Sequence, residues 1–95
     1  MDLLRSREQL ERAHDVAKFE FIATELDIAI TFCEMAIAAE DQNKAERSAK
    51  HARQAYEVAK RFLPKARLEP LMNQEIDEKL QRLEPLLQQL GDGHE

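Results

Sequence analysis

The sequence has very few of the residues that make tight turns. Its 95 residues include two glycines, three prolines and no tryptophan. A β-sandwich or an α/β sheet has many tight connections and needs more turn residues than this, so both fold classes are excluded. The chain is instead rich in alanine, leucine and glutamate, which are strong helix formers and indicate an all-α fold.

Cysteine and long apolar runs are also scarce. Cys33 is the single cysteine, so no internal disulfide can form and nothing indicates an oxidising compartment. The chain does not begin with a basic segment and an apolar run, and it has no stretch of about 18 apolar residues. We expect an unprocessed, soluble protein of the cytoplasm.

The net charge of −5 disfavours binding to nucleic acid or to an anionic membrane, and we expect neither as a partner. A chain of this length can bury one core but not a core and a deep pocket as well. We therefore expect a protein that is not an enzyme.

Hydrophobic periodicity predicts a long first helix over about residues 2–40. Between Phe19 and Ala39, polar or small residues recur every three or four positions, at Glu20, Thr24, Asp27, Thr31, Glu34 and Ala38. The positions between them are mostly apolar: Phe21, Ile22, Leu26, Ile28, Ala29, Ile30, Phe32, Cys33, Met35, Ala36 and Ile37. So wide an apolar face indicates a helix that contacts two others.

A second helix is predicted over residues 43–63. Asn43 and Glu46 have the spacing of a capping box, and Pro64 ends the helix. An alanine-rich line on this helix allows two backbones to approach closely: Ala45, Ala49, Ala52, Tyr56, Ala59 and Leu63. His51 lies beside that line, where we expect a half-buried packing residue.

The third helix is predicted over residues 70–90, with Pro70 either at its first turn or in the preceding connection. Its apolar stripe comprises Met72, Ile76, Leu80, Leu83, Leu87 and Leu90. Pro85 interrupts the stripe and predicts a kink or break near residues 81–84. Gly91 is the expected C-cap, and residues 91–95 the expected flexible tail.

These elements predict one domain over residues 1–90, an up-down-up antiparallel three-helix bundle with a long first helix. The second helix reaches along the first only from Glu40 back to about Glu20. Residues 2–17 then have no neighbour, although an apolar spacing continues through Leu3, Leu4, Leu10, Ala13 and Ala17, the candidate interaction residues.

We expect two copies to cover this segment by pairing their first helices as an antiparallel homodimer. Basic side chains would then face acidic ones across the seam: Arg5, Arg7 and Arg12 against Glu8, Glu11 and Asp15. In the competing arrangement the protein is a monomer, because the segment folds back near His14 and Asp15 or the 65–73 connection covers it.

One residue pair has the spacing of a metal motif. Glu11 and His14 match the Glu-x-x-His pattern of di-iron bundles, which needs a second copy. His51 has Arg47 or Ser48 where the second glutamate should be. We expect no metal and no cofactor. Cys33 lies on the apolar face and is expected in the core, and no catalytic residue is predicted.

Charge is divided unevenly along the chain. Residues 1–43 contain four basic and ten acidic residues, residues 44–67 eight and two, and residues 68–95 two and seven. The basic residues of the middle segment are Lys44, Arg47, Lys50, Arg53, Lys60, Arg61, Lys65 and Arg67. In one interpretation these residues complement the acidic neighbouring helices, and pairs such as Glu46 with Lys50 add small stabilising contributions within the helix. In the other they form a docking surface for an acidic partner. The first interpretation is preferred.

The second predicted helix resembles part of a known repeat. The spacing of Ala52, Tyr56, Ala59 and Pro64 is similar to that of the second helix of a tetratricopeptide repeat. The chain departs from that repeat at Ala36, Ala39, Glu40 and Asn43. The order of a long helix, an alanine-rich hairpin and a leucine-rich helix also resembles the microtubule-interacting-and-transport domain, which binds short helical peptides. Both resemblances imply a helical interaction module.

The sequence thus predicts a small non-enzymatic helical module that binds another protein or a second copy of itself. The alternative is a helical bundle that binds a small ligand or a metal. These two classes differ in the core, because a ligand-binding bundle needs inward polar groups and the predicted core has almost none.

Overall fold

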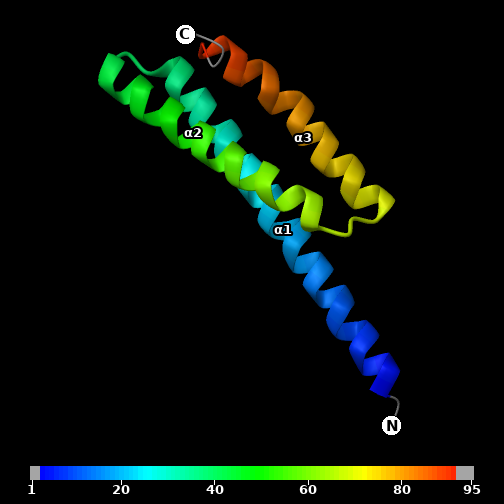
Figure 1. The fold of residues 1–95 in the computed structure, drawn as a ribbon. Helices are drawn as coiled ribbons and strands as arrows, with labels where there is room; N and C mark the ends of the chain where they lie inside the picture. The colour runs from blue at the N-terminus through cyan, green and yellow to red at the C-terminus, as the bar shows by residue number, and fades with distance from the viewer. Residues whose placement is uncertain (1–2, 92–95) are drawn as a thin grey trace.

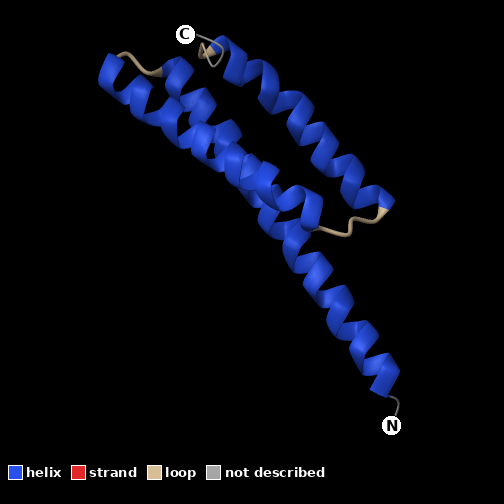
Figure 2. Cartoon of the chain, viewed as in Figure 1, coloured by secondary structure: helices blue, strands red, loops and turns tan. Residues whose placement is uncertain are grey.

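The computed structural model describes residues 3–91, with side chains from residue 6 onward. Its helices are α1 (Leu3–Ala38), α2 (Gln42–Phe62) and α3 (Pro70–Gln89), and a short 3₁₀ turn, η1 (Leu63–Lys65), follows α2. Figures 1 and 2 show the helices running alternately up, down and up, with loops between them. The predicted all-α three-helix bundle with a long first helix is confirmed.

Helix α1 is the central element of the bundle. Both α2 and α3 pack on it, whereas α2 and α3 make few contacts with each other. The core comprises Ile22, Ala23, Leu26, Ala29, Ile30 and Cys33 of α1, Ala52, Ala55 and Ala59 of α2, and Ile76, Leu83 and Leu87 of α3. All the α1 members lie between residues 22 and 33, so the core is confined to the part of α1 that the other helices cover.

The interface between α1 and α2 is built on alanine. Ala49, Ala52, Ala55 and Ala59 are all buried, and Ala52 is completely so. Small side chains let the two helix backbones come close, as the sequence predicts. Ring contacts fix the alignment of the pair: the Phe21 and Phe62 rings lie 5.2 Å apart near one end.

The N-cap of α2 differs from the predicted one. Helix α2 begins at Gln42, and its cap is Asp41, whose Oδ1 accepts a hydrogen bond from the Asn43 backbone N–H at 2.8 Å. Asn43 is therefore inside the first turn, and the predicted capping box is wrong. Glu46 accepts a hydrogen bond from the Gln42 side chain at 3.3 Å instead. The physical reason is that an aspartate in extended backbone geometry already satisfies the free amide at this end.

Helix α3 contains two prolines, and of the predicted kink or break near residues 81–84 the break is absent. Pro70 occupies the first helical position, where its missing N–H costs nothing. Pro85 lies inside a helix that continues without a break to Gln89. Pro85 is exposed, so water can solvate the carbonyl that loses its partner, and the helix tolerates the residue. The C-cap of α3 is Leu90 and not the expected Gly91, which follows it with a φ of 80°. The rest of the predicted tail lies outside the described residues.

Polar contacts hold α3 against the other two helices. Lys79 Nζ lies 2.7 Å from Asp27 Oδ1, and Arg82 Nη2 lies 3.0 Å from Glu34 Oε2. The Tyr56 hydroxyl donates a hydrogen bond to Glu84 of α3 at 3.1 Å. These groups are at least partly exposed, so each pair contributes modestly and orients α3 more than it stabilises it.

The molecule is elongated, 61 Å by 21 Å by 20 Å. Its length comes from α1, whose N-terminal half extends beyond the ends of α2 and α3 (Figure 1). This uncovered half has the features of a candidate interaction surface.

Candidate interaction surface

The N-terminal part of α1 is an uncovered helix. We call residues 3–17 the overhang. Leu3 and Leu4 lie in α1, but their side chains lie outside the described residues. Leu10 is 63% exposed, and Ala13 and Ala17 are exposed as well. The sequence gives these candidates the spacing of a buried stripe, yet in the described part of the chain no helix packs on Leu10, Ala13 or Ala17.

Two arrangements within one chain were expected to cover the overhang: a fold-back near His14 and Asp15, or the 65–73 connection lying along it. Helix α1 is continuous through His14 and Asp15, so the segment does not fold back. A crevice of about 280 Å³ lies between the overhang and the residues that precede and begin α3. Its wall on that side is formed by Arg67, Glu69 and Met72. Asp15 and Val16 are half-buried there, but residues 6–14 remain exposed. The connection thus covers only the end of the overhang nearest the bundle.

A line of apolar residues, alanines and two threonines continues from the overhang along the outer side of α1. Phe21, Ile28 and Met35 are spaced seven residues apart and are 43%, 37% and 50% exposed. Beside them lies a second seven-residue series, also exposed: Leu10, Ala17, Thr24, Thr31 and Ala38. We call these eight residues the outer line. At 3.6 residues per turn, Ile28 lies about 160° around the helix from the core residue Leu26.

This outer line was not recognised from the sequence. The sequence interpretation assigned Phe21, Ile28 and Met35 to the face that packs on two other helices. The polar stripe that begins at Glu20 is exposed as predicted, and these three apolar residues are exposed beside it. The signal that could have found them is the seven-residue spacing, which differs from the four-and-three spacing of the core residues Ile22, Leu26 and Ala29.

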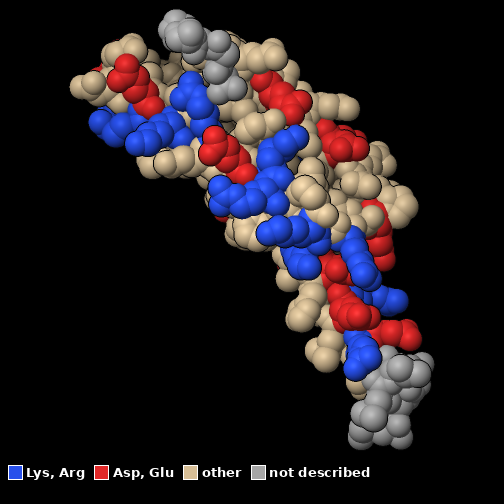
Figure 3. Space-filling view, viewed as in Figure 1, with Lys and Arg blue, Asp and Glu red and all other residues tan. Residues whose placement is uncertain are grey.

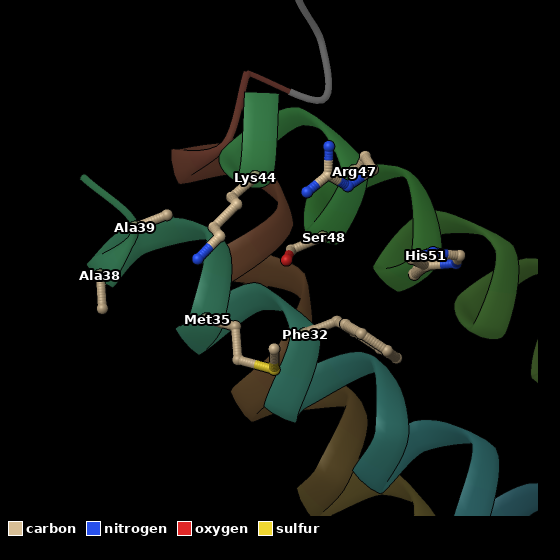
Figure 4. A pocket seen from close by; sticks show the side chains of 8 residues that line it. All are labelled: Phe32, Met35, Ala38, Ala39, Lys44, Arg47, Ser48 and His51. Atoms are coloured by element: carbon tan, nitrogen blue, oxygen red, sulfur yellow. The ribbon is translucent and has the colours of Figure 1, made fainter. Parts of the chain in front are cut away.

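A groove adjoins the outer line between the end of α1 and the start of α2. It has a volume of about 530 Å³, and its lining comprises Phe32, Met35 and Ala38 of α1, Ala39 of the link, and Lys44, Arg47, Ser48 and His51 of α2. Figure 4 shows these side chains on the two helices, with Lys44 reaching from α2 toward α1. The α1 side of the groove is apolar, and its α2 side carries two cations.

His51 lies at the wall of this groove. Its ring is 5.0 Å from the ring of Phe32, at an angle of 36°. His51 itself is exposed, so the prediction of a half-buried packing residue is wrong. It lies at the side of the alanine line that faces the groove, and Phe32 covers only one side of its ring.

Most basic residues of α2 are exposed: Lys44, Arg47, Lys50, Lys60 and Arg61. On the face shown in Figure 3, lysine and arginine gather along α2, and acidic side chains lie over α3 and the lower part of α1. Two ion pairs, Lys79 with Asp27 and Arg82 with Glu34, join α3 to α1. Lys60 lies over the ring of Tyr56 and Lys65 over that of Phe62, at 5.8 Å and 5.4 Å. The expected pair of Glu46 with Lys50 does not form.

The predicted metal motif is dispersed in space. Glu11 and His14 are exposed on the overhang. His51 lies beside Phe32, which is 18 residues and so about 27 Å further along α1 than His14. Within residues 6–91, no three His, Cys, Asp or Glu side chains lie close enough together to hold a metal ion. Cys33 is completely buried in the core, as predicted.

Comparison with family models, with curated proteins and with solved structures found no match. None of the helices described here combines the length and the apolar character needed to cross a bilayer. The function is therefore inferred from the chain's own surface.

Proposed function

We propose that the protein is a small non-enzymatic helical interaction module of the cytoplasm that associates with a second copy of itself through the overhang of α1. The observation that carries this proposal is Leu10, which is 63% exposed on a helical segment without a neighbour. An isolated helix of this length is marginally stable in water, so a partner that buries its apolar residues would stabilise it. Symmetric pairing is the commonest arrangement of soluble oligomers.

The core supports an interaction module over a ligand-binding bundle. A bundle that binds a small molecule or a metal presents polar groups inward. In the described part of the chain the buried polar side chain is Ser48, at the edge of α2, and the remaining buried residues are apolar. The exposed apolar residues lie on the outer side of α1 instead.

Static light scattering tests this function on the intact chain, on a chain without residues 1–14, and on a Leu10→Lys variant. We expect the intact chain to have twice the monomer mass of 11.0 kDa at high concentration. The other two should be monomers, because they lack the apolar overhang or place a charge in it. Leu71→Lys is the matched control, since Leu71 is 81% exposed on α3 and should tolerate the charge without effect.

An intact chain that is monomeric at every concentration would contradict the proposal. So would a truncated chain or a Leu10→Lys variant that dimerises as the intact chain does. Circular dichroism of each variant shows whether the bundle is still folded.

A further inference from the structure

The groove between α1 and α2 combines an apolar wall with a basic one. Phe32 and Met35 lie on the α1 side, where Phe32 is half-buried and Met35 is 50% exposed. Lys44 and Arg47 lie on the α2 side, and both are exposed. The described residues that line the groove include no carboxylate. The groove therefore presents two positive charges beside an apolar surface, in a chain whose net charge is −5.

The two cations of the groove are available to a partner. Within residues 6–91, neither Lys44 nor Arg47 forms an ion pair. Figure 4 shows the Lys44 side chain extending from α2 toward the α1 side of the groove. An anionic group that binds here would gain charge-assisted hydrogen bonds without breaking an existing ion pair of either residue.

The groove is open to solvent, which favours a polypeptide over a small molecule. Small-molecule sites bury most of the ligand's surface. Five of the eight residues that line this groove are exposed: Met35, Ala38, Lys44, Arg47 and His51. Both walls are helices, so the groove has no strand edge with which an extended peptide could pair. A helix satisfies its own backbone groups and binds through its side chains, as this groove requires.

The spacing of the lining residues specifies the pattern of this helix. Phe32, Met35 and Ala38 follow one another at intervals of three residues, so they line about 9 Å of α1 at 1.5 Å per residue. A wall of this length accommodates apolar side chains from two successive turns of a helix. Lys44 and Arg47 are about one turn apart on α2. Two carboxylates that are also one turn apart would match this pair of cations.

We infer that the groove binds an acidic amphipathic helix of another protein, with the apolar side chains of that helix against Phe32 and Met35 and its carboxylates on Lys44 and Arg47. A nucleic acid fits less well, because it would bring phosphates to the two cations but polar sugars to the apolar wall. No residue of the overhang lines the groove. The acidic helix and the second copy of the chain therefore bind at separate surfaces.

Fluorescence anisotropy of a labelled peptide, measured with the full chain, tests this inference. The acidic probe is an alanine-rich peptide of about four turns, with leucines spaced three or four residues apart and two glutamates one turn apart beside them. The basic probe has lysine in place of both glutamates. We expect the acidic probe to bind at least about tenfold more tightly, because only its charges are opposite to those of the groove. Equal binding of the two probes would contradict the inference.

A charge-reversal variant locates the binding site. Lys44→Glu with Arg47→Glu should weaken binding of the acidic probe at least about tenfold and should favour the basic probe. Lys50→Glu with Arg61→Glu is the matched control, because it changes the net charge equally and both residues are exposed outside the groove. The control should bind the acidic probe as the unmodified chain does. Equal losses in the two variants would mean that the probe follows the overall charge of α2, and the inference would be wrong.

The variant Met35→Lys separates docking in the groove from attraction by charge alone. It adds a cation to the groove and removes an apolar contact from the α1 wall. We expect weaker binding of the acidic probe, because its leucines lose a surface on which to pack. Binding that is unchanged or tighter would show that charge alone holds the probe, which contradicts the inference. Circular dichroism shows whether each variant is still folded.

The Leu10→Lys chain separates this inference from the proposed self-association. It should bind the acidic probe as the unmodified chain does, because Leu10 does not line the groove. If the probe binds only to this variant, a second copy occupies the groove in the unmodified chain, and the inference is wrong. Decanoate, an anion with a short apolar chain, is the probe for a small ligand. If decanoate binds and neither peptide does, the inference is also wrong.

Discussion

At the scale of single residues, the start of α2 has two residues that could serve as its N-cap. Asp41 and Asn43 are both residue types that cap helices well, and Glu46 follows Asn43 at the spacing of a capping box, which favours Asn43 in the sequence. In the structure the Asp41 carboxylate accepts the Asn43 amide at 2.8 Å. The sequence could not decide between them, since the choice depends on where the three-residue link leaves α1.

The two candidates make different predictions on substitution. We expect Asp41→Ala to lower the free energy of unfolding by about 1 kcal/mol, because the amide loses its acceptor. Asn43→Ala is the control and should change it by less than about 0.5 kcal/mol, since that side chain is exposed inside the first turn. Urea denaturation at a fixed protein concentration measures both. The reverse order of effects would show that Asn43 is the cap.

At the scale of helices, the sequence predicted existence and direction well but not continuity or coverage. Pro64, Pro70 and Gly91 stand at or next to helix ends, as expected from proline and glycine chemistry. Pro85 has the same chemistry but does not end α3, because it lies on the solvent side. The periodicity of α1 likewise gives its apolar positions. It does not show how wide a face of α1 the two neighbouring helices bury. Phe21, Ile28 and Met35 lie outside that buried face.

The tolerated proline predicts a stabilising substitution. Pro85→Ala should restore a backbone donor for the Gln81 carbonyl and raise the free energy of unfolding by on the order of 1–2 kcal/mol. Gln88→Ala, at an exposed position of the same helix, should have little effect. Thermal unfolding followed by circular dichroism gives both values. A Pro85→Ala variant that is less stable than the unmodified chain would mean that the proline shapes α3 to fit α1.

At the scale of the whole molecule, the notable feature is a helix longer than the bundle built on it. The sequence predicted this overhang from helix lengths, and the structure has it. The groove and the outer line could not be predicted in the same way, because they depend on how α2 packs against α1 near Lys44 and on which side of α1 stays open. The overhang is the part of this open surface on which the proposed self-association rests.

The distance between two labelled overhangs tests the proposed self-association through the overhang most directly. A nitroxide is attached at Gln9→Cys, which is exposed, in a chain whose buried cysteine is replaced by Cys33→Ala. Double electron–electron resonance then measures the separation of the two labels in the dimer. Gln9 lies close to the middle of the overhang, so when two overhangs pair, with their axes about 8–10 Å apart, the labels should be less than about 25 Å from each other. A separation of about 40 Å or more, or the absence of any dipolar coupling, would contradict the account.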